Sequence, residues 1–358
     1  SAPSASLFTP LAMRVSHSFS ALIGPFLGGL VVLQLSLTGC ESSLSVDPPD
    51  HAPQLVVNGF FVNGERWVVT ASQSVGAFEN VNPDDPRFTV NDATITVTPA
   101  GGMPVTLALT DTLTAPYIFG ETRRRVGPAY VAFAPTPQVE ETYTLRAEAP
   151  GLPAVDAQST VPSFPPVDVS STARRVPRGG VDPGFVRQER TVTLRIDDPP
   201  EQANRYWIRT VFVDSVYIDS VDTYRVLQQP VSFVTRNPSV RDEAYDALND
   251  DGAYEGDTAH FSDALFDGTT HDLDLTFEEF FSTERQRNRR SYVVVEMATL
   301  SPALYDYLTS VRRYDESSDN PFAEPVNVHS NVEPGYGIFA GRHERRLAVR
   351  IGLVEEGS

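Results

Sequence analysis

The sequence contains no lysine, so all 28 of its basic residues are arginine, set against 47 acidic residues and a formal net charge of −19. An acidic surface lacks the cluster of positive charge that phosphate binding requires, which argues against nucleic acid as a partner. Two origins of the bias stay open, a GC-rich genome that favours arginine codons and adaptation to high salt. Neither origin indicates a mechanism.

Cysteine is almost as scarce, with Cys40 the single example in 358 residues. One cysteine excludes a disulfide framework within a monomer and any metal site built from several cysteines. The chain is nevertheless 41% hydrophobic and 10% aromatic, as a folded protein is, and its length allows about two domains.

The apolar run from Ala21 to Leu37 is shorter than the roughly 20 residues that a membrane-spanning helix needs. Gly-Pro and Gly-Gly pairs within it weaken it further as a helix. With Arg14 before it and small residues after it, the run predicts a secretory signal. We therefore interpret residues 1–39 as a signal peptide, with Met13 as the expected natural start.

The run closes with Leu37-Thr-Gly-Cys40, which resembles the lipobox of bacterial lipoproteins. The resemblance implies that Cys40 carries a diacylglyceryl thioether and, after cleavage, an acylated amine. Two or more acyl chains anchor a protein stably in a membrane. The polar, proline-containing residues 40–53 would then be a lipid tether. The alternative is a buried core cysteine behind an ordinary signal.

From residue 54 the apolar pattern has a period of two, and no helix-length period occurs before about residue 235. Asn63-Gly64 predicts a hairpin and Gly101-Gly102 a further turn. We expect an antiparallel β-sandwich over residues 54–165, of a generic immunoglobulin-like or prealbumin-like kind.

Residues 166–190, rich in proline, glycine and arginine, are expected to be a linker or crossover. A second β-rich domain is expected over residues 191–358. Its clearest helix begins at Ser301, a good cap, and continues to about Arg313, while a weaker helical piece covers about 238–248. The predicted fold class is therefore mainly β, with one or two short helices in the second domain.

Metal and catalytic candidates are thinly spread. His260 and His271 bracket Asp263, Asp267 and Asp272, which makes a candidate divalent-ion group, but no pair has the short spacing of zinc ligands.

Residues 249–257 are similar to an oxygen-ligand calcium loop but depart from the EF-hand register, so a solvated acidic loop competes with that interpretation. The sequence has no Gly-x-Ser-x-Gly elbow and no His-Glu-x-x-His motif. Adjacent Glu278 and Glu279 give no sign of facing a cleft. We predict a non-enzymatic protein without catalytic residues, cofactor or metal.

Gly335-Tyr-Gly-Ile-Phe-Ala-Gly341 has nearly the spacing of a dinucleotide-binding loop. Such a loop needs a helix after it, whereas the residues that follow Gly341 predict a strand. The glycines are instead expected to serve tight turns or close backbone approach.

The longer stretch Asn320–Gly341, which includes these glycines, resembles the C-terminal signature of a bacterial lipoprotein family known only as domain of unknown function 4249. Further similar stretches are Leu55–Gly59, Tyr143–Gly151, Phe261–Gly268 and Tyr305–Leu308. The signature residues are Asn320, Pro321, Phe322, Glu324, Pro325, Ser330, Asn331, Gly335, Gly337 and Phe339. A structural role for them is the leading interpretation, and a partner-binding edge is the alternative.

The family resemblance implies a Gram-negative outer membrane, and genes that often lie beside TonB-dependent transporters. No activity is established for the family. We expect a lipid-anchored accessory of such a transporter or of an envelope assembly, facing either the periplasm or the cell surface. A surface lipoprotein that binds a glycan or peptide is the alternative, and an uncharacterised enzyme is third.

Overall fold

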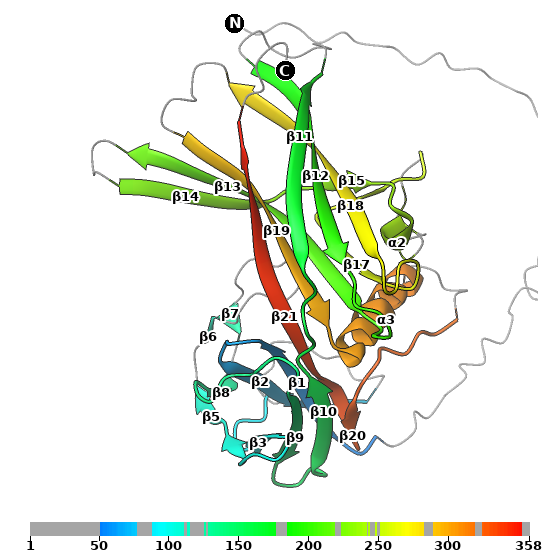
Figure 1. Cartoon of the computed structure of the whole chain (residues 1–358). Coiled ribbons are helices and arrows are strands. Elements are labelled where there is room, and N and C mark those ends of the chain that lie inside the picture. Colours follow the sequence, from blue (N-terminus) through cyan, green and yellow to red (C-terminus); the bar gives the residue numbers. More distant parts are fainter. Residues whose placement is uncertain are drawn as a thin grey trace, which may run out of the picture. The chain divides into compact units, whose positions relative to one another are not determined.

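The computed structural model describes residues 51–76, 88–110, 113–114, 125–126, 128–176, 185–218, 223–241, 243, 248, 251–282, 289–318 and 324–352. Their strands form one large sheet, two five-stranded sheets and a two-stranded ribbon (Figure 1). The ribbon pairs β6 (Leu113–Thr114) with β7 (Arg125–Val126).

The large sheet has nine strands in the order β14-β13-β19-β21-β1-β2-β8-β5, with β17 beside β13. The described pairings are antiparallel except that of β1 with β21, which is parallel and sets Val57 opposite Gly337. The predicted Asn63-Gly64 turn connects β1 to β2, with Gly64 at φ 75°. The strands are β1 (Leu55–Val62), β2 (Trp67–Gln73), β5 (Ala108–Thr110), β8 (Ala129–Ala132), β13 (Arg205–Ile218), β14 (Thr223–Pro230), β17 (Thr258–Ser262), β19 (Arg289–Leu300) and β21 (Tyr336–Ile351).

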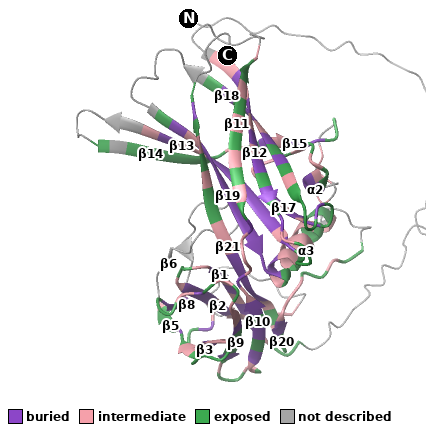
Figure 2. Ribbon diagram, in the orientation of Figure 1, coloured by how far each residue is buried: buried purple, intermediate pink, exposed green. Residues whose placement is uncertain are grey.

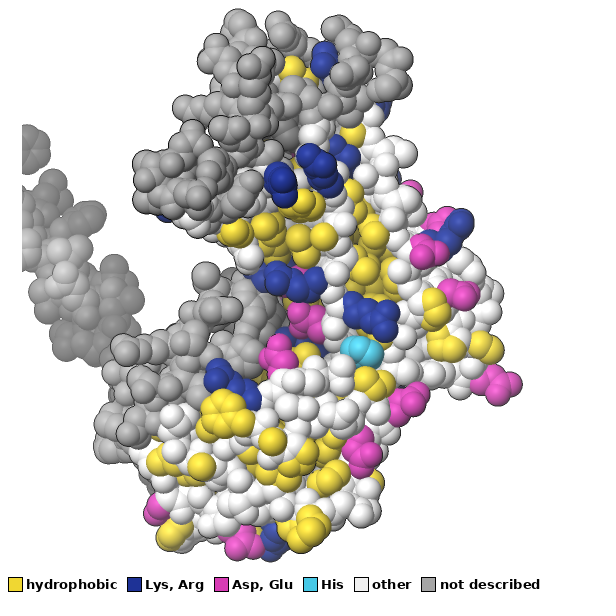
Figure 3. Space-filling view, turned by 60° about the vertical axis from the view of Figure 1, so that its left-hand side comes forward, with side chains coloured by type: hydrophobic (Ala, Val, Ile, Leu, Met, Phe, Trp, Pro, Cys, Tyr) yellow, Lys and Arg dark blue, Asp and Glu magenta, His cyan; other side chains and the backbone are white. Residues whose placement is uncertain are grey.

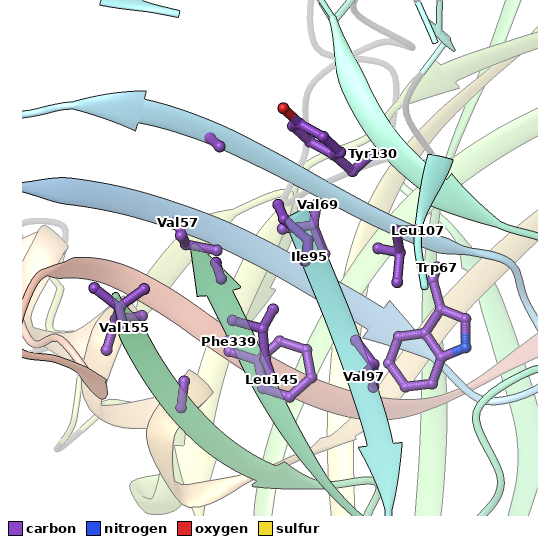
Figure 4. Close-up of a cluster of buried hydrophobic side chains, with 14 of the residues drawn as sticks. Val57, Trp67, Val69, Ile95, Val97, Leu107, Tyr130, Leu145, Val155 and Phe339 are labelled. Carbon is purple, nitrogen blue, oxygen red and sulfur yellow. The ribbon is translucent and has the colours of Figure 1, made fainter. Parts of the chain in front are cut away.

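A five-stranded sheet in the order β20-β10-β9-β3-β4 packs on β1, β2 and the start of β21, and encloses the first core. Aromatic rings fill much of it: Phe61 lies 4.7 Å from Phe339 and 5.1 Å from Trp67 between ring centroids. Figure 4 shows Phe339 beside Leu145 within the cluster and Trp67 toward one end. The strands are β3 (Thr94–Pro99), β4 (Val105–Thr106), β9 (Thr142–Glu148), β10 (Val155–Thr160) and β20 (Val332–Glu333).

The other five-stranded sheet, in the order β11-β12-β18-β15-β16, packs on β13, β19 and the end of β21, and encloses the second core. Leu194 of β12, Leu275 of β18 and Val295 of β19 are fully buried there. Side chains alternate along these strands, so every second residue enters the core. The strands are β11 (Val167–Arg175), β12 (Phe185–Asp197), β15 (Phe233–Thr235), β16 (Tyr254–Gly256) and β18 (Thr270–Ser282).

Strand β21 takes part in both cores. Phe339 near its start is buried in the first core, whereas Leu347 and Val349 near its end pack against the second. These residues share one face of the strand, so both five-stranded sheets cover the same face of the large sheet. Figure 2 shows β21 buried toward its start and more exposed beyond. The shared strand explains why residues 51–358 are one compact unit with two cores.

Helix α3 (Pro302–Ser318) covers part of the opposite face of the large sheet. Ser301 caps the helix, since its Oγ accepts the N–H of Leu304 at 3.4 Å and its carbonyl accepts that of Tyr305 at 3.1 Å. Leu304 is fully buried in a cluster with Trp207. The helix predicted from Ser301 is confirmed and extends further than expected.

The predicted fold class, mainly β with sandwiched sheets and short helices, is confirmed. Within the weaker helical piece, α2 (Pro238–Arg241) is present and most of residues 242–248 lie outside the described part. In the segment expected to be a linker or crossover, 166–190, β11 pairs with β12, and residues 177–184 lie outside the described part. β11 is an edge strand in which Val167 and Val169 pack against the second core, but its later residues are mostly polar, so the apolar alternation is too short to reveal it.

Candidate functional site

The glycines of the C-terminal signature let β21 and the turn before it approach β1 closely. A Cβ on Gly337 would lie 2.0 Å from the carbonyl oxygen of Val57, and one on Gly335 would lie 2.5 Å from that of Leu55. Gly337 also has φ 113°, which side-chain-bearing residues rarely adopt. The prediction of positive φ or close backbone approach at these glycines is confirmed.

Asn331 completes the backbone hydrogen bonding of the same strand. Its Nδ2 donates to the carbonyl oxygens of Phe339 at 2.8 Å and Gln158 at 3.1 Å. Its Oδ1 accepts the N–H of Phe339 at 2.9 Å, and Ser330 Oγ accepts the N–H of Val332 at 3.3 Å. The two polar side chains thus act on the backbone of β20, β10 and β21, as a structural role requires.

The other signature residues divide by position. Phe339 is fully buried in the first core, whereas Glu324 and Pro325 are exposed. Asn320–Phe322 and Cys40 lie outside the described residues. The contacts of Ser330, Asn331, Gly335, Gly337 and Phe339 thus serve the fold, and the partner-binding alternative stays a prediction.

The candidate ion group assembles differently from the sequence prediction. Asp263 and Asp267 meet Asp198, with carboxylate oxygens within 4.8 Å of one another. Asp198 and Asp263 are buried and hydrogen-bonded: Asp198 accepts from Gly268 N at 3.1 Å, and Asp263 accepts the N–H of Asn204. The protein thus already supplies partners to both buried carboxylates.

The two histidines of the candidate ion group, His260 and His271, lie in other environments. His271 stacks on Phe266 at 4.0 Å, and His260 lies against the Tyr305 ring of α3. Asp272 pairs with Arg195 on the surface. Sequence proximity therefore misled the ion-site interpretation, because β-strand alternation sends these side chains to different environments.

Acidic residues of the calcium-like loop and of the Glu278-Glu279 pair form ion pairs with arginines. Asp251 of the calcium-like loop pairs with Arg236, while Glu278 pairs with Arg187. Glu279 forms a buried pair with Arg190 at 2.7 Å. Figure 3 shows such an interspersed surface on one face, where arginine, acidic and hydrophobic side chains lie next to one another.

An apolar hollow of about 260 Å³ opens at one end of the first core. Trp67 of β2 and Tyr143 of β9 border it, and both rings are almost wholly buried. The turn between β3 and β4 and the loop after β8 complete its wall. The lining residues are Trp67, Val97, Pro99, Ala100, Gly101, Gly102, Val105, Pro135, Thr136, Gln138, Glu141 and Tyr143.

Hydrogen bonds hold the wall of this hollow in place. Trp67 Nε1 donates to the carbonyl oxygen of Pro135 at 2.8 Å, and the hydroxyl oxygen of Tyr143 accepts the N–H of Gln138 at 2.8 Å. Gln138 Nε2 donates to the carbonyl oxygen of Thr136 at 2.9 Å. These bonds fix the loop against the core, so the hollow is formed before any ligand arrives.

Glu141 is the charged residue of this wall. Burial raises the pKa of the Tyr143 hydroxyl, and the charge of Glu141 raises it further, which is consistent with the carboxylate lying near the phenol. Within the described part of the chain, the Glu141 side chain has neither a hydrogen-bond nor an ion-pair partner.

A second hollow of about 560 Å³ lies beside α3 and is mainly polar in lining. Glu243 lines it, and its Oε1 accepts the N–H of Ser262 at 2.9 Å and the Ser262 hydroxyl at 2.7 Å. The Tyr305 hydroxyl donates to the same carboxylate. These contacts tie α3 to β17, so Glu243 has a structural role here.

The apolar hollow leaves little signal in the sequence. Its residues come from β2, β3, β4, β9 and the loops between them, and most are ordinary apolar or turn residues in their own segments. A tryptophan at a strand start, as Trp67 is, was the one local signal available.

The comparisons place the chain in a family. The model of the domain of unknown function DUF4249 matches residues 41–347, so this chain belongs to that family. No curated protein matches the chain.

Among solved structures, the chain is similar to a mutant of Salmonella alpha-2-macroglobulin. The identity is 12% over 85% of this chain and 15% of that one, with a TM-score of 0.22. This chain thus spans a small part of that protein's length, and the likeness carries no argument here.

Proposed function

We propose that this protein is a lipid-anchored component of the bacterial outer membrane that binds a peptide segment and is not itself an enzyme. The apolar hollow bordered by Trp67 and Tyr143 is the observation that carries the proposal. A preformed apolar concavity with a few polar groups at its wall is the usual form of a binding site.

The size and lining of the hollow favour a peptide over a glycan. At about 260 Å³ it is smaller than the roughly 300–1,000 Å³ typical for whole drug-sized ligands, so it suits one apolar side chain of a longer ligand. Trp67 and Tyr143 are 2% and 4% exposed, and thus offer no open ring face on which a sugar could stack.

Peptide binding can be tested with the two indole N–H signals, because the chain has two tryptophans. Blocked tripeptides Ac-Gly-X-Gly-NH2 with X as Leu or Phe should shift the Trp67 signal in a saturable way, and the X = Gly peptide should not. The Trp207 signal is an internal control, since that residue lies in the separate cluster near α3. Thr136→Phe should fill the hollow and abolish the shift, while Thr144→Phe, at an exposed site of β9, should not. Equal shifts in both variants, or none in the parent, would contradict peptide binding.

The lipid anchor rests on the lipobox-like sequence that ends in Cys40. The Cys40→Ser variant should lose palmitate labelling and move to the soluble fraction of the cell. Equal membrane retention of the variant would rule out lipid anchoring through this residue. Which face of the membrane the protein occupies would follow from protease access in intact cells.

Strand direction does not by itself argue against catalysis, because β1 and β21 give the large sheet a parallel pair. The non-enzymatic proposal rests on the partners that occupy the carboxylates considered as ligands or acid–base groups. Asp272, Glu278 and Glu279 all form ion pairs with arginines, and the carboxylate of Glu243 is held by Ser262 and Tyr305.

A second candidate function, an accessory of a TonB-dependent transporter or envelope assembly, is favoured by the edge strand β14. Val226 and Leu227 are 53% and 47% exposed on it, and β14 pairs on one side with β13 (Figure 2). Exposed apolar edge strands can add a strand from a partner. A transporter should co-purify with the detergent-extracted protein and be lost with Leu227→Lys. Retention of the transporter by that variant would count against this edge.

A further inference from the structure

We infer that the ligand of the apolar hollow carries a positive charge next to its apolar group, so that it is a peptide segment with an apolar residue beside a basic one. This inference rests on the proposed peptide-binding function. It adds the charge of the ligand, which the volume of the hollow does not determine.

Glu141 is the residue that points to this chemistry. It lines the hollow, and it is half-buried rather than fully solvated. Several other carboxylates of the described residues are paired, such as Glu148 with Arg146 at 2.8 Å and Asp272 with Arg195 at 2.8 Å. Glu141, in contrast, has no such partner among the described residues.

The surroundings of the carboxylate favour a cation over a neutral donor. The wall around Glu141 is largely apolar, including Pro99, Val105 and Pro135, and a charge pair is stronger where water is partly excluded. The whole chain is also acidic, with a net charge of −19, so its field attracts a cationic ligand and repels an anionic one. Both features complement a basic peptide.

The hollow offers different contacts to the apolar side chain and to the basic side chain of the ligand. Pro99, Val105 and Pro135 provide an accessible apolar wall that would contact an aliphatic or aromatic side chain. Glu141 immediately precedes β9 and lies two residues before Tyr143 in the chain. A basic residue adjacent to the buried apolar one would thus reach the carboxylate and form a charge-assisted hydrogen bond.

Three blocked peptides test the inference by titration against the Trp67 indole signal: Ac-Gly-Leu-Gly-NH2, Ac-Arg-Leu-Gly-NH2 and Ac-Glu-Leu-Gly-NH2. The arginine peptide should bind about fivefold more tightly than the neutral one at low salt, a difference typical of one partly exposed ion pair. The glutamate peptide should bind more weakly than both. The advantage of arginine should shrink as salt is added.

Glu141→Gln is the decisive variant. It should lose the preference for arginine, so that the arginine and the neutral peptide bind this variant with similar affinity. Glu140→Gln is the matched control, because it removes the same charge from an exposed neighbour that does not line the hollow, and it should keep most of the preference. If the neutral peptide binds and arginine gives no gain, the inference is overturned and peptide binding stands. If both variants lose the preference equally, Glu141 is not the recognition residue. If no peptide binds, both proposals fail.

Discussion

The side-chain amide of Asn331 pairs with both backbone groups of Phe339, donating to its carbonyl at 2.8 Å and accepting from its N–H at 2.9 Å. A side chain here replaces the neighbouring strand that would otherwise satisfy these groups. The contact connects the segment after α3 to β21, and it explains why an amide residue occurs at this place in the signature.

Asn331→Ala should therefore destabilise the protein by about 2 kcal/mol, because it leaves partly buried backbone groups without partners. Urea unfolding followed by fluorescence measures the change. Asn327→Ala is the control, since Asn327 is exposed in the same segment and should change stability by less than about 0.5 kcal/mol. Similar values for the two variants would contradict a structural role of Asn331.

Gly337→Ala should be more damaging. Its Cβ would lie 2.0 Å from the carbonyl oxygen of Val57 at a φ of 113°, so β21 must move away from β1. We expect a loss of at least about 2 kcal/mol in the free energy of unfolding. Gly352→Ala, where an added Cβ meets nothing within 4 Å, should be nearly neutral. A neutral Gly337→Ala would mean that close approach of these strands is not required.

The buried pair of Arg190 and Glu279 should behave differently from an exposed one. Both side chains are 7% exposed, and Gln188 Nε2 also donates to Glu279 at 2.7 Å. Arg190→Met leaves a buried charge and should cost about 3–5 kcal/mol, whereas Arg190→Met with Glu279→Met should recover much of that loss. Arg195→Met breaks a surface pair, so it should cost about 1 kcal/mol or less. A double variant as unstable as the single one would refute the buried-charge explanation.

The free energy of unfolding should decrease as the pH is lowered, because of His260. Burial, together with the nearby charge of Arg312, lowers its pKa from 6.5 to about 4. Between these values the unfolded chain binds a proton that the folded protein does not, so stability is full above about pH 6.5 and decreases as pH falls toward 4. His260→Gln should flatten this decrease in urea midpoints measured from pH 4 to 8. A variant at exposed His51 should leave the slope unchanged, and an unaltered slope in His260→Gln would contradict the prediction.

Local sequence patterns predicted the elements well where one face is buried. β9 alternates between buried Tyr143, Leu145 and Ala147 and exposed residues, so its period of two is visible in the sequence. The helix from Ser301 was likewise predicted from its cap and its apolar face. β11 was missed because only Val167 and Val169 on its inner face are large apolar residues, so its apolar period is too short to recognise.

The sequence by itself determined the β-rich class, the Asn-Gly hairpin and the capped helix. Each of these depends on residues within a few positions of one another. Only the tertiary structure decided that β21 serves both cores, that Asp198 joins Asp263, and that Trp67, Glu141 and Tyr143 border one hollow. Such contacts join residues that are far apart in the chain, and strand order, which brings them together, depends on the packing of whole sheets rather than on local propensity.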